Sequence, residues 1–150
     1  MKIKAKAFQQ ETDYTCLPAC IRIVLNFFGD EKPEKEIASA CHTTNAGTRF
    51  RDAVHAIRSV GYEVTQIQDG SLDELFTSIL NKEPVIVALG AEHLPYGDFG
   101  SHAVVIIGFE GNNAVLIEPA FGKEIKIDLL EFLKAWQSRG KKGIIIHQQK

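Results

Sequence analysis

The sequence predicts an α+β fold, with a helical N-terminal half packed on an antiparallel sheet in the C-terminal half. Amphipathic helical patterns with clear start and stop signals dominate residues 16–80. Short apolar or alternating runs separated by turns dominate residues 85–147. This segregation is typical of an α+β domain with one cleft between its two parts. The length of 150 residues, 45% of them hydrophobic, leads us to expect a single domain over residues 1–150.

Charge and composition exclude several classes of protein. The net charge is −2 and there is no basic block, so we expect no nucleic-acid partner. No apolar run approaches the roughly 18 residues of a membrane span, so we expect no direct membrane insertion. Three cysteines without a secretory signal favour reduced thiols in the cytoplasm.

The most clearly marked helix begins at a cysteine. Cys16 stands at the expected N-cap, Pro18 lies in the first turn, and Gly29 follows the end as a C′ residue. A helix N-terminus carries roughly half a positive charge, so a thiol placed there loses its proton more readily. Cys16 is therefore a candidate nucleophile, although a cysteine at such a position is often only a core residue.

Two more helices and one strand are expected before the next capping signal. Residues 34–41 suit a short helix, and Thr48 can cap a longer one that ends at Gly61. Residues 62–67 alternate as a half-buried strand does. Ser71 and Glu74 then form a capping box. The buried face of the helix behind it is expected to hold five apolar residues: Leu72, Leu75, Phe76, Ile79 and Leu80.

The C-terminal half reads as strands with one helix. The near-continuous apolar run 85–89 predicts a strand covered on both faces. A turn at 111–113 joins two further strands as a hairpin. Asp128 caps the last helix. Strands are expected at 103–107, 114–117, 124–128 and 143–147.

A histidine and an acid on the hairpin complete the expected chemistry of Cys16. His102 directly precedes an apolar strand, where it can pair with a thiolate. Glu118 ends the strand that pairs across the hairpin, so it should lie near His102 and orient the imidazole. The competing interpretation of Glu118 is a solvated residue at the sheet edge.

Covalent catalysis also requires donors for an oxyanion. The Cys16 backbone N–H at the helix start is one, and the Gln10 side-chain amide is the natural second. Gln9 is the neighbouring alternative, and the sequence does not separate the two.

These residues form part of a larger pattern that resembles the C39 peptidases, which are papain-like cysteine proteases. The resemblance covers about residues 10–136, and the order Gln, Cys, His, acid is kept. It rests on eight pieces: Gln10-x5-Cys16, Pro18-Ala-Cys20, Gly29, Gly47-Thr48, Pro84-Val-Ile-Val, His102-Ala-Val-Val, Glu118-Pro119-Ala120 and Phe132-x3-Trp136.

The resemblance implies a papain-like fold and a cysteine peptidase. It implies an oxyanion-hole glutamine at Gln10, a nucleophile at Cys16, a base at His102 and an orienting acid at Glu118, with no metal or cofactor. It also implies a peptide substrate such as a leader peptide and an association with an ABC transporter, which would place the domain at the inner face of the membrane. The chain departs from the family at two positions, with Leu17 for the usual Gly and Glu118 for the usual Asp.

The remaining cysteines and histidines have weaker signals. Cys20, one turn after Cys16, is expected to fill the core. A zinc site with Cys41 and His42 would lack the paired spacing of structural zinc sites. His42, His55, His93 and His147 are expected at the surface, with a place along the cleft left open as the alternative for His93.

Two alternatives to a peptidase remain open. One is a weakly active or inactive peptide-docking domain associated with an ABC transporter. The other is an enzyme that transfers the acyl group to a non-peptide acceptor. The retention of Gln10, Cys16 and His102 argues against the first, since a docking domain has no use for a nucleophile. The second would leave the same residues in place.

Overall fold

The computed structural model describes residues 1–149, in which six strands form one antiparallel sheet of order β1-β6-β2-β3-β4-β5. The strands are β1 Val64–Ile67, β2 Val85–Gly90, β3 Ser101–Glu110, β4 Asn113–Glu118, β5 Lys123–Asp128 and β6 Gly143–Ile146. The helices are α1 Cys16–Phe27, α2 Glu34–Ala40, α3 Phe50–Ser59, α4 Leu72–Leu80 and α5 Leu129–Gln137, with a 3-10 turn η1 Ala91–His93. The predicted α+β class is confirmed.

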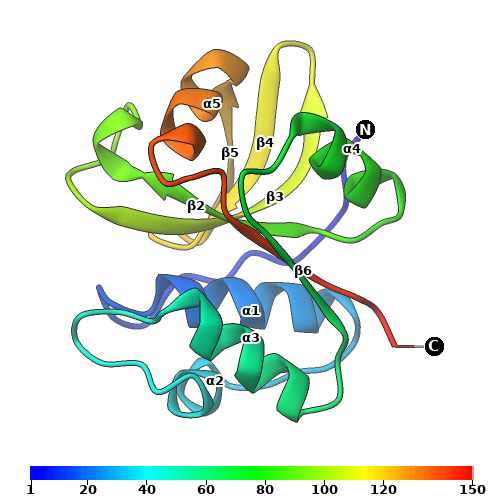
Figure 1. Cartoon of the computed structure of the whole chain (residues 1–150), viewed down its shortest axis with the longest axis vertical. Coiled ribbons are helices and arrows are strands. Elements are labelled where there is room, and N and C mark those ends of the chain that lie inside the picture. The colour runs from blue at the N-terminus through cyan, green and yellow to red at the C-terminus, as the bar shows by residue number, and fades with distance from the viewer. Residues whose placement is uncertain (150) are drawn as a thin grey trace.

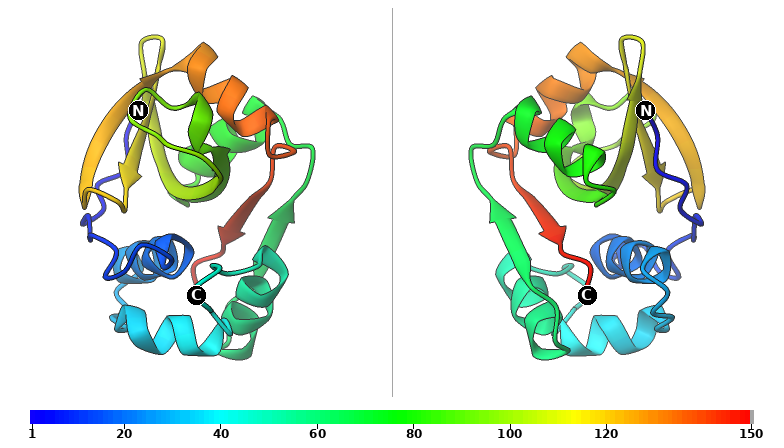
Figure 2. Two further views of the ribbon diagram at one scale, coloured as in Figure 1. Left: turned by 90° about the vertical axis from the view of Figure 1, so that its left-hand side faces the viewer. Right: turned by 90° about the vertical axis from the view of Figure 1, so that its right-hand side faces the viewer.

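Helices cover both sides of the sheet. α1, α2 and α3 lie together on one side, and α4 and α5 lie on the other (Figure 1). α1 packs on β3, and α5 packs on β2. β1 comes from the N-terminal half, yet it pairs with β6 at the edge of the sheet (Figure 2). The simple division into a helical half and a sheet half is therefore incomplete. β1 joins the sheet from the N-terminal half, and α5 from the C-terminal half packs on β2, because a central strand needs apolar cover on both faces.

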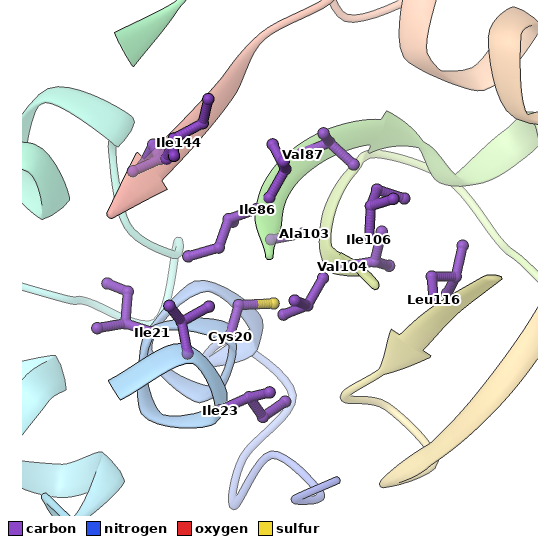
Figure 3. Packing of buried hydrophobic residues seen from close by; sticks show 14 of the residues in the cluster. Cys20, Ile21, Ile23, Ile86, Val87, Ala103, Val104, Ile106, Leu116 and Ile144 are labelled. Atoms are coloured by element: carbon purple, nitrogen blue, oxygen red, sulfur yellow. The ribbon is translucent and has the colours of Figure 1, made fainter. Parts of the chain in front are cut away.

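The core lies between α1 and the central strands. All six residues of β2 are buried, as its continuous apolar run predicts. Cys20 and Ile21 project from α1 among side chains of β2 and β3, including Ile86 and Val104 (Figure 3). Cys20 has no solvent exposure and is a core residue, as expected.

The ends of the helices refine the predicted signals. α1 begins at Cys16 with Thr15 as its N-cap, one residue before the predicted cap. At its other end, Gly29 has a φ of 89° and its N–H donates to the Asn26 carbonyl at 2.9 Å, while the Asp30 N–H reaches Leu25. This is a Schellman motif, and its left-handed residue favours glycine.

Two expectations for caps have different outcomes. Thr48 does not cap α3: the N-cap is Arg49, and the Thr48 hydroxyl lies 2.6 Å from that of Thr43. The capping box of Ser71 and Glu74 at the start of α4 is confirmed.

The predicted buried face of α4 is too wide. Leu75 and Ile79, which are four residues apart, are buried, but Phe76 is 37% exposed and Leu80 is 64% exposed. Phe76 instead packs edge-to-face on Phe109, with the ring centroids 4.4 Å apart. The short helix has room for only one narrow apolar stripe against the sheet. Across residues 1–149, no helix has both the length and the apolar character needed to cross a membrane.

Candidate active site

Cys16 occupies the first turn of α1 and is partly buried. The Leu17 side chain behind it is 3% exposed and belongs to the core. The Leu17 backbone N–H interacts with the Cys16 sulfur and contributes to lowering its pKa. The Leu17 side chain therefore contributes to the core, while its backbone N–H still helps to lower the pKa of the Cys16 thiol.

The structure brings His102 to Cys16. Burial raises the pKa of the Cys16 thiol, but the interaction with the His102 imidazole and the N–H groups of Ala103 and Leu17 outweighs it. The net result is a pKa below the ordinary 9.0. Burial lowers the pKa of His102, whereas Cys16 and Glu118 together raise it above its ordinary 6.5. These opposite shifts favour a thiolate beside an imidazolium.

Glu118 is fully buried and holds the other side of the imidazole. Its Oε1 lies 2.5 Å from His102 Nε2 and accepts the Ala120 N–H at 2.9 Å. Its Oε2 accepts the Tyr96 hydroxyl at 2.7 Å. The exposed fraction of Glu118 is 0%, which rules out the solvated edge glutamate. A buried carboxylate with this many donors is held in one orientation.

A β-bulge puts Glu118 on the same face of the sheet as His102. Near the turn Glu110 pairs with Asn113, a register that would continue to place Val105 opposite Glu118. Between Ile106 and Gly108 the register shifts by one residue, so Val105 pairs with Ile117. Glu118 then comes opposite the residue before Val105, which points to the same side as His102. Without the bulge, the acid would point away from the imidazole.

The N-terminal segment packs against this bulge. The Ile3 N–H donates to the Ile107 carbonyl at 2.7 Å, and Lys2 pairs with Gly108. A Cβ at Gly108 would lie 2.3 Å from the Met1 carbonyl oxygen, so only glycine allows the two backbones to approach this closely. The first three residues thus support the part of β3 that sets the register.

Gln10 and Gln9 are distinguished by their surroundings. Gln10 is partly buried; its Nε2 donates to the Thr12 carbonyl at 2.7 Å, and its buried Oε1 has no hydrogen-bond partner. Gln9 is exposed and donates to the Ala120 carbonyl at 3.3 Å. Within residues 1–149 no hydrogen bond links either amide to Cys16. Gln10 keeps a second N–H for a bound group.

A cleft of about 380 Å³ opens beside Cys16 and His102. One wall is formed by residues 46–50 and the start of α1, and the other by β2, β3, Arg139 and Lys142. His93 does not line the cleft. It is exposed on η1, and the adjacent residue Glu92 pairs with Arg139 at 3.0 Å. The expected surface position of His93 is therefore confirmed, and the alternative position along the cleft is wrong.

Tyr96 is the partner of Glu118 that the sequence did not reveal. It lies in the loop between η1 and β3, where only its aromatic character could have marked it. Burial raises the pKa of Tyr96, and the charge and hydrogen bond of Glu118 raise it further, so the hydroxyl remains a donor. Its ring packs edge-to-face on Phe121 with centroids 5.2 Å apart, which fixes the hydroxyl.

The other two thiols have the opposite electrostatics. Burial raises the pKa of Cys20 well above 9.0, and nearby negative groups raise it further. Burial, with a smaller effect of Asp52, raises the pKa of Cys41 to about 11. All three cysteines are free, and only Cys16 has a lowered pKa.

Comparison with known proteins gives the following similarities. The model of the Peptidase_C39 like family matches residues 2–144. A structure from Bacillus anthracis, described as a C39-like peptidase, aligns with a TM-score of 0.77 and 16% identity over 98% of this chain and 99% of that chain. A double glycine motif protease from the AMS/PCAT transporter, in complex with the leader peptide, gives 0.76 and 23% over 99% and 94%.

The peptidase domain of Streptococcus ComA, a bi-functional ABC transporter involved in a quorum sensing pathway, gives a TM-score of 0.76 and 21% identity over 96% of this chain and 98% of that chain. None of the curated proteins compared with the chain matches it. At these identities the solved structures show a shared fold. The expected fold is therefore confirmed.

Proposed function

The chain belongs to the Peptidase_C39 like family, and from this premise we propose that it is a cysteine peptidase with Cys16 as nucleophile. His102 is the proposed general base and acid, Glu118 the orienting acid, and Gln10 an oxyanion donor. The observation that carries the proposal is the arrangement of Cys16 beside His102 at the cleft, with Glu118 bonded to the imidazole, in which the pKa of the thiol falls and that of the imidazole rises. A domain that only docks peptides has no use for an activated thiol.

The proposed reaction has two steps. The Cys16 thiolate attacks the carbonyl carbon of a peptide bond, and the oxyanion is held by the Cys16 N–H and the Gln10 amide. The C–N bond then breaks as the His102 imidazolium gives its proton to the leaving amine. In the second step His102 takes a proton from water, the hydroxide attacks the thioester, and the acid leaves as the Cys16 thiolate and His102 imidazolium are restored.

The proposed substrate is a peptide or protein segment, with a leader peptide as the first candidate. Its basis is the likeness to a transporter-associated protease solved with a leader peptide and to a transporter peptidase domain. We propose association with an ABC transporter on the same basis, with residues 1–150 as one catalytic domain. The reduced thiols favour a cytoplasmic location, at the membrane if the domain is part of a transporter.

The proposal is tested by alkylation of the three cysteines with iodoacetamide over a series of pH values. Only the thiolate reacts, so the rate at Cys16 should rise with pH through a midpoint below 9.0 and then level off. At pH 7 Cys20 and Cys41 should remain unmodified, because their pKa values are raised and they are buried. Peptide mass mapping measures each site. Equally slow labelling of all three thiols would contradict the proposal.

Tyr96→Phe tests the support of Glu118. The change removes a hydrogen bond to a buried carboxylate but keeps the ring against Phe121. A hydrogen bond to a charged group contributes about 1.5–3 kcal/mol, so we expect kcat to fall about tenfold or more with KM nearly unchanged. The measurement is steady-state cleavage of a peptide that the wild type cuts.

Tyr62→Phe is the matched control for this variant. The Tyr62 hydroxyl donates to Asp30 at 2.7 Å, so the same type of bond is lost far from Cys16. We expect Tyr62→Phe to lower the unfolding temperature without changing kcat. Equal kcat values for Tyr96→Phe and Tyr62→Phe would show that Tyr96 does not position the acid.

A further inference from the structure

Apart from His102, the charged side chains that line the cleft beside Cys16 in the described residues 1–149 are all cations. Arg49 lies on one wall, and Arg139 and Lys142 lie on the other. Within residues 1–149 no Asp or Glu lines the cleft. The molecule as a whole carries a net charge of −2, so the cationic lining is a local feature and not a consequence of composition.

The three cations differ in how far their charge is already compensated. Arg49 Nε pairs with Asp52 at 2.8 Å, and Arg139 pairs with Glu92 at 3.0 Å. Lys142 has no ion-pair partner in the described part of the chain, and its side chain is exposed to the cleft. Lys142 is therefore the cation whose charge is least neutralised by the protein itself, and it can attract a bound anion most strongly.

The sheet places Lys142 at a definite distance from the strand that carries His102. Its carbonyl accepts the Ala88 N–H at 3.2 Å, and Ala88 pairs with Ala103, the residue after His102. Two strand spacings, roughly 10 Å, thus separate Lys142 from the His102 strand. An extended peptide covers that distance in about three residues.

The walls between these groups leave room for a side chain. Ala46, Gly47, Ala88 and Ala103 line the cleft with small side chains. Gly47 has open space around it, with a φ of 104°. A carboxylate can therefore enter the cleft without displacing a large residue.

We propose that the cleft selects peptides that carry an Asp or Glu side chain within about three residues of the scissile bond, with Lys142 as the main anion contact. This inference rests on the proposed peptidase function and names its substrate class. The attraction is between a substrate carboxylate and a cation whose own charge is not neutralised, and it acts over a short range in salt.

The first test compares iodoacetate with iodoacetamide, which differ in charge but react with a thiolate in the same way. The rate of iodoacetate at Cys16 is divided by the rate of iodoacetamide, and this ratio is divided by the same ratio for glutathione. The normalised ratio measures the attraction of an anion to the site. Lys142→Glu should lower this normalised ratio about fivefold at low salt, since it changes the charge near the cleft by two units. The difference should collapse in 1 M salt, where the Debye length is roughly 3 Å.

Lys134→Glu is the matched control, because Lys134 is exposed on α5 and does not line the cleft. Lys142→Glu should fold normally, since the contacts of Lys142 to Ala88 and Trp136 use its backbone carbonyl. An unchanged ratio in Lys142→Glu, or an equal fall in Lys134→Glu, would overturn the inference. If iodoacetamide itself fails to label Cys16 faster than Cys20, the proposed function is what fails.

A peptide mixture derived from a proteome provides the second test. Cleavage sites read by mass spectrometry should be enriched in Asp or Glu within three residues of the cut, and Lys142→Glu should lose the enrichment. Cleavage without that enrichment, or with the same enrichment in both proteins, would overturn the inference. If nothing in the mixture is cut, the labelling ratio alone decides.

Discussion

Replacing Cys16 with alanine should abolish peptide cleavage. Loss of the nucleophile from a covalent mechanism lowers kcat by roughly 10⁴-fold or more, because only binding and oxyanion stabilisation remain. Cys16 is partly exposed and its neighbour Leu17 carries the core contacts, so the fold should be unaffected. The measurement is product formation by mass spectrometry from a peptide that the wild type cuts.

Cys20→Ala is the matched control on the same helix. It removes a sulfur one turn away, from a side chain with no solvent exposure. We expect a small loss of unfolding free energy, about 1 kcal/mol, and unchanged cleavage per folded molecule. Residual cleavage by Cys16→Ala at the wild-type rate would exclude Cys16 as nucleophile.

Replacing His102 should affect both cleavage and the acidity of Cys16. Without the imidazole, burial of the thiol acts against the two backbone N–H groups alone, so the pKa of Cys16 should rise. The midpoint of iodoacetamide labelling should move to higher pH, and cleavage should fall roughly 10³- to 10⁴-fold. His102→Gln, which keeps a donor for buried Glu118, separates these effects from a loss of stability.

His147→Ala provides the comparison for His102. His147 also pairs with a carboxylate, since its Nδ1 lies 3.1 Å from Glu83 Oε2, but it is remote from the cleft. We expect neither the labelling midpoint nor cleavage to change in this variant. A Cys16 midpoint that stays in place in His102→Gln would show that the imidazole does not activate the thiol.

Much of the fold could be predicted because its signals are local. The capping box of Ser71 and Glu74, the glycine after α1 and the apolar run of β2 each act within a few residues. The predictions that failed depend on distant partners. Phe76 packs against Phe109 of β3 and is not buried in the core. The Thr48 hydroxyl forms a hydrogen bond with that of Thr43 and does not cap a helix.

The candidate site could be predicted in part. The residue types and their order point to Cys16, His102 and Glu118, and the structure brings these three together. Their catalytic roles stay predictions. Gln10 could be named but not separated from Gln9, because the difference in burial between them arises only when the segment packs against residues 119–120.

The sequence by itself determined the chemistry that is available: a cysteine at a helix N-terminus, a histidine at a strand start and an acid at the far end of a hairpin. Only the tertiary structure decided how these meet. The bulge between Ile106 and Gly108 turns Glu118 toward His102, since a shift of one residue reverses the face to which each side chain points. Tyr96 and Lys142 reach the site from segments with no local signal, because side chains distant in sequence become neighbours only through the packing of the chain.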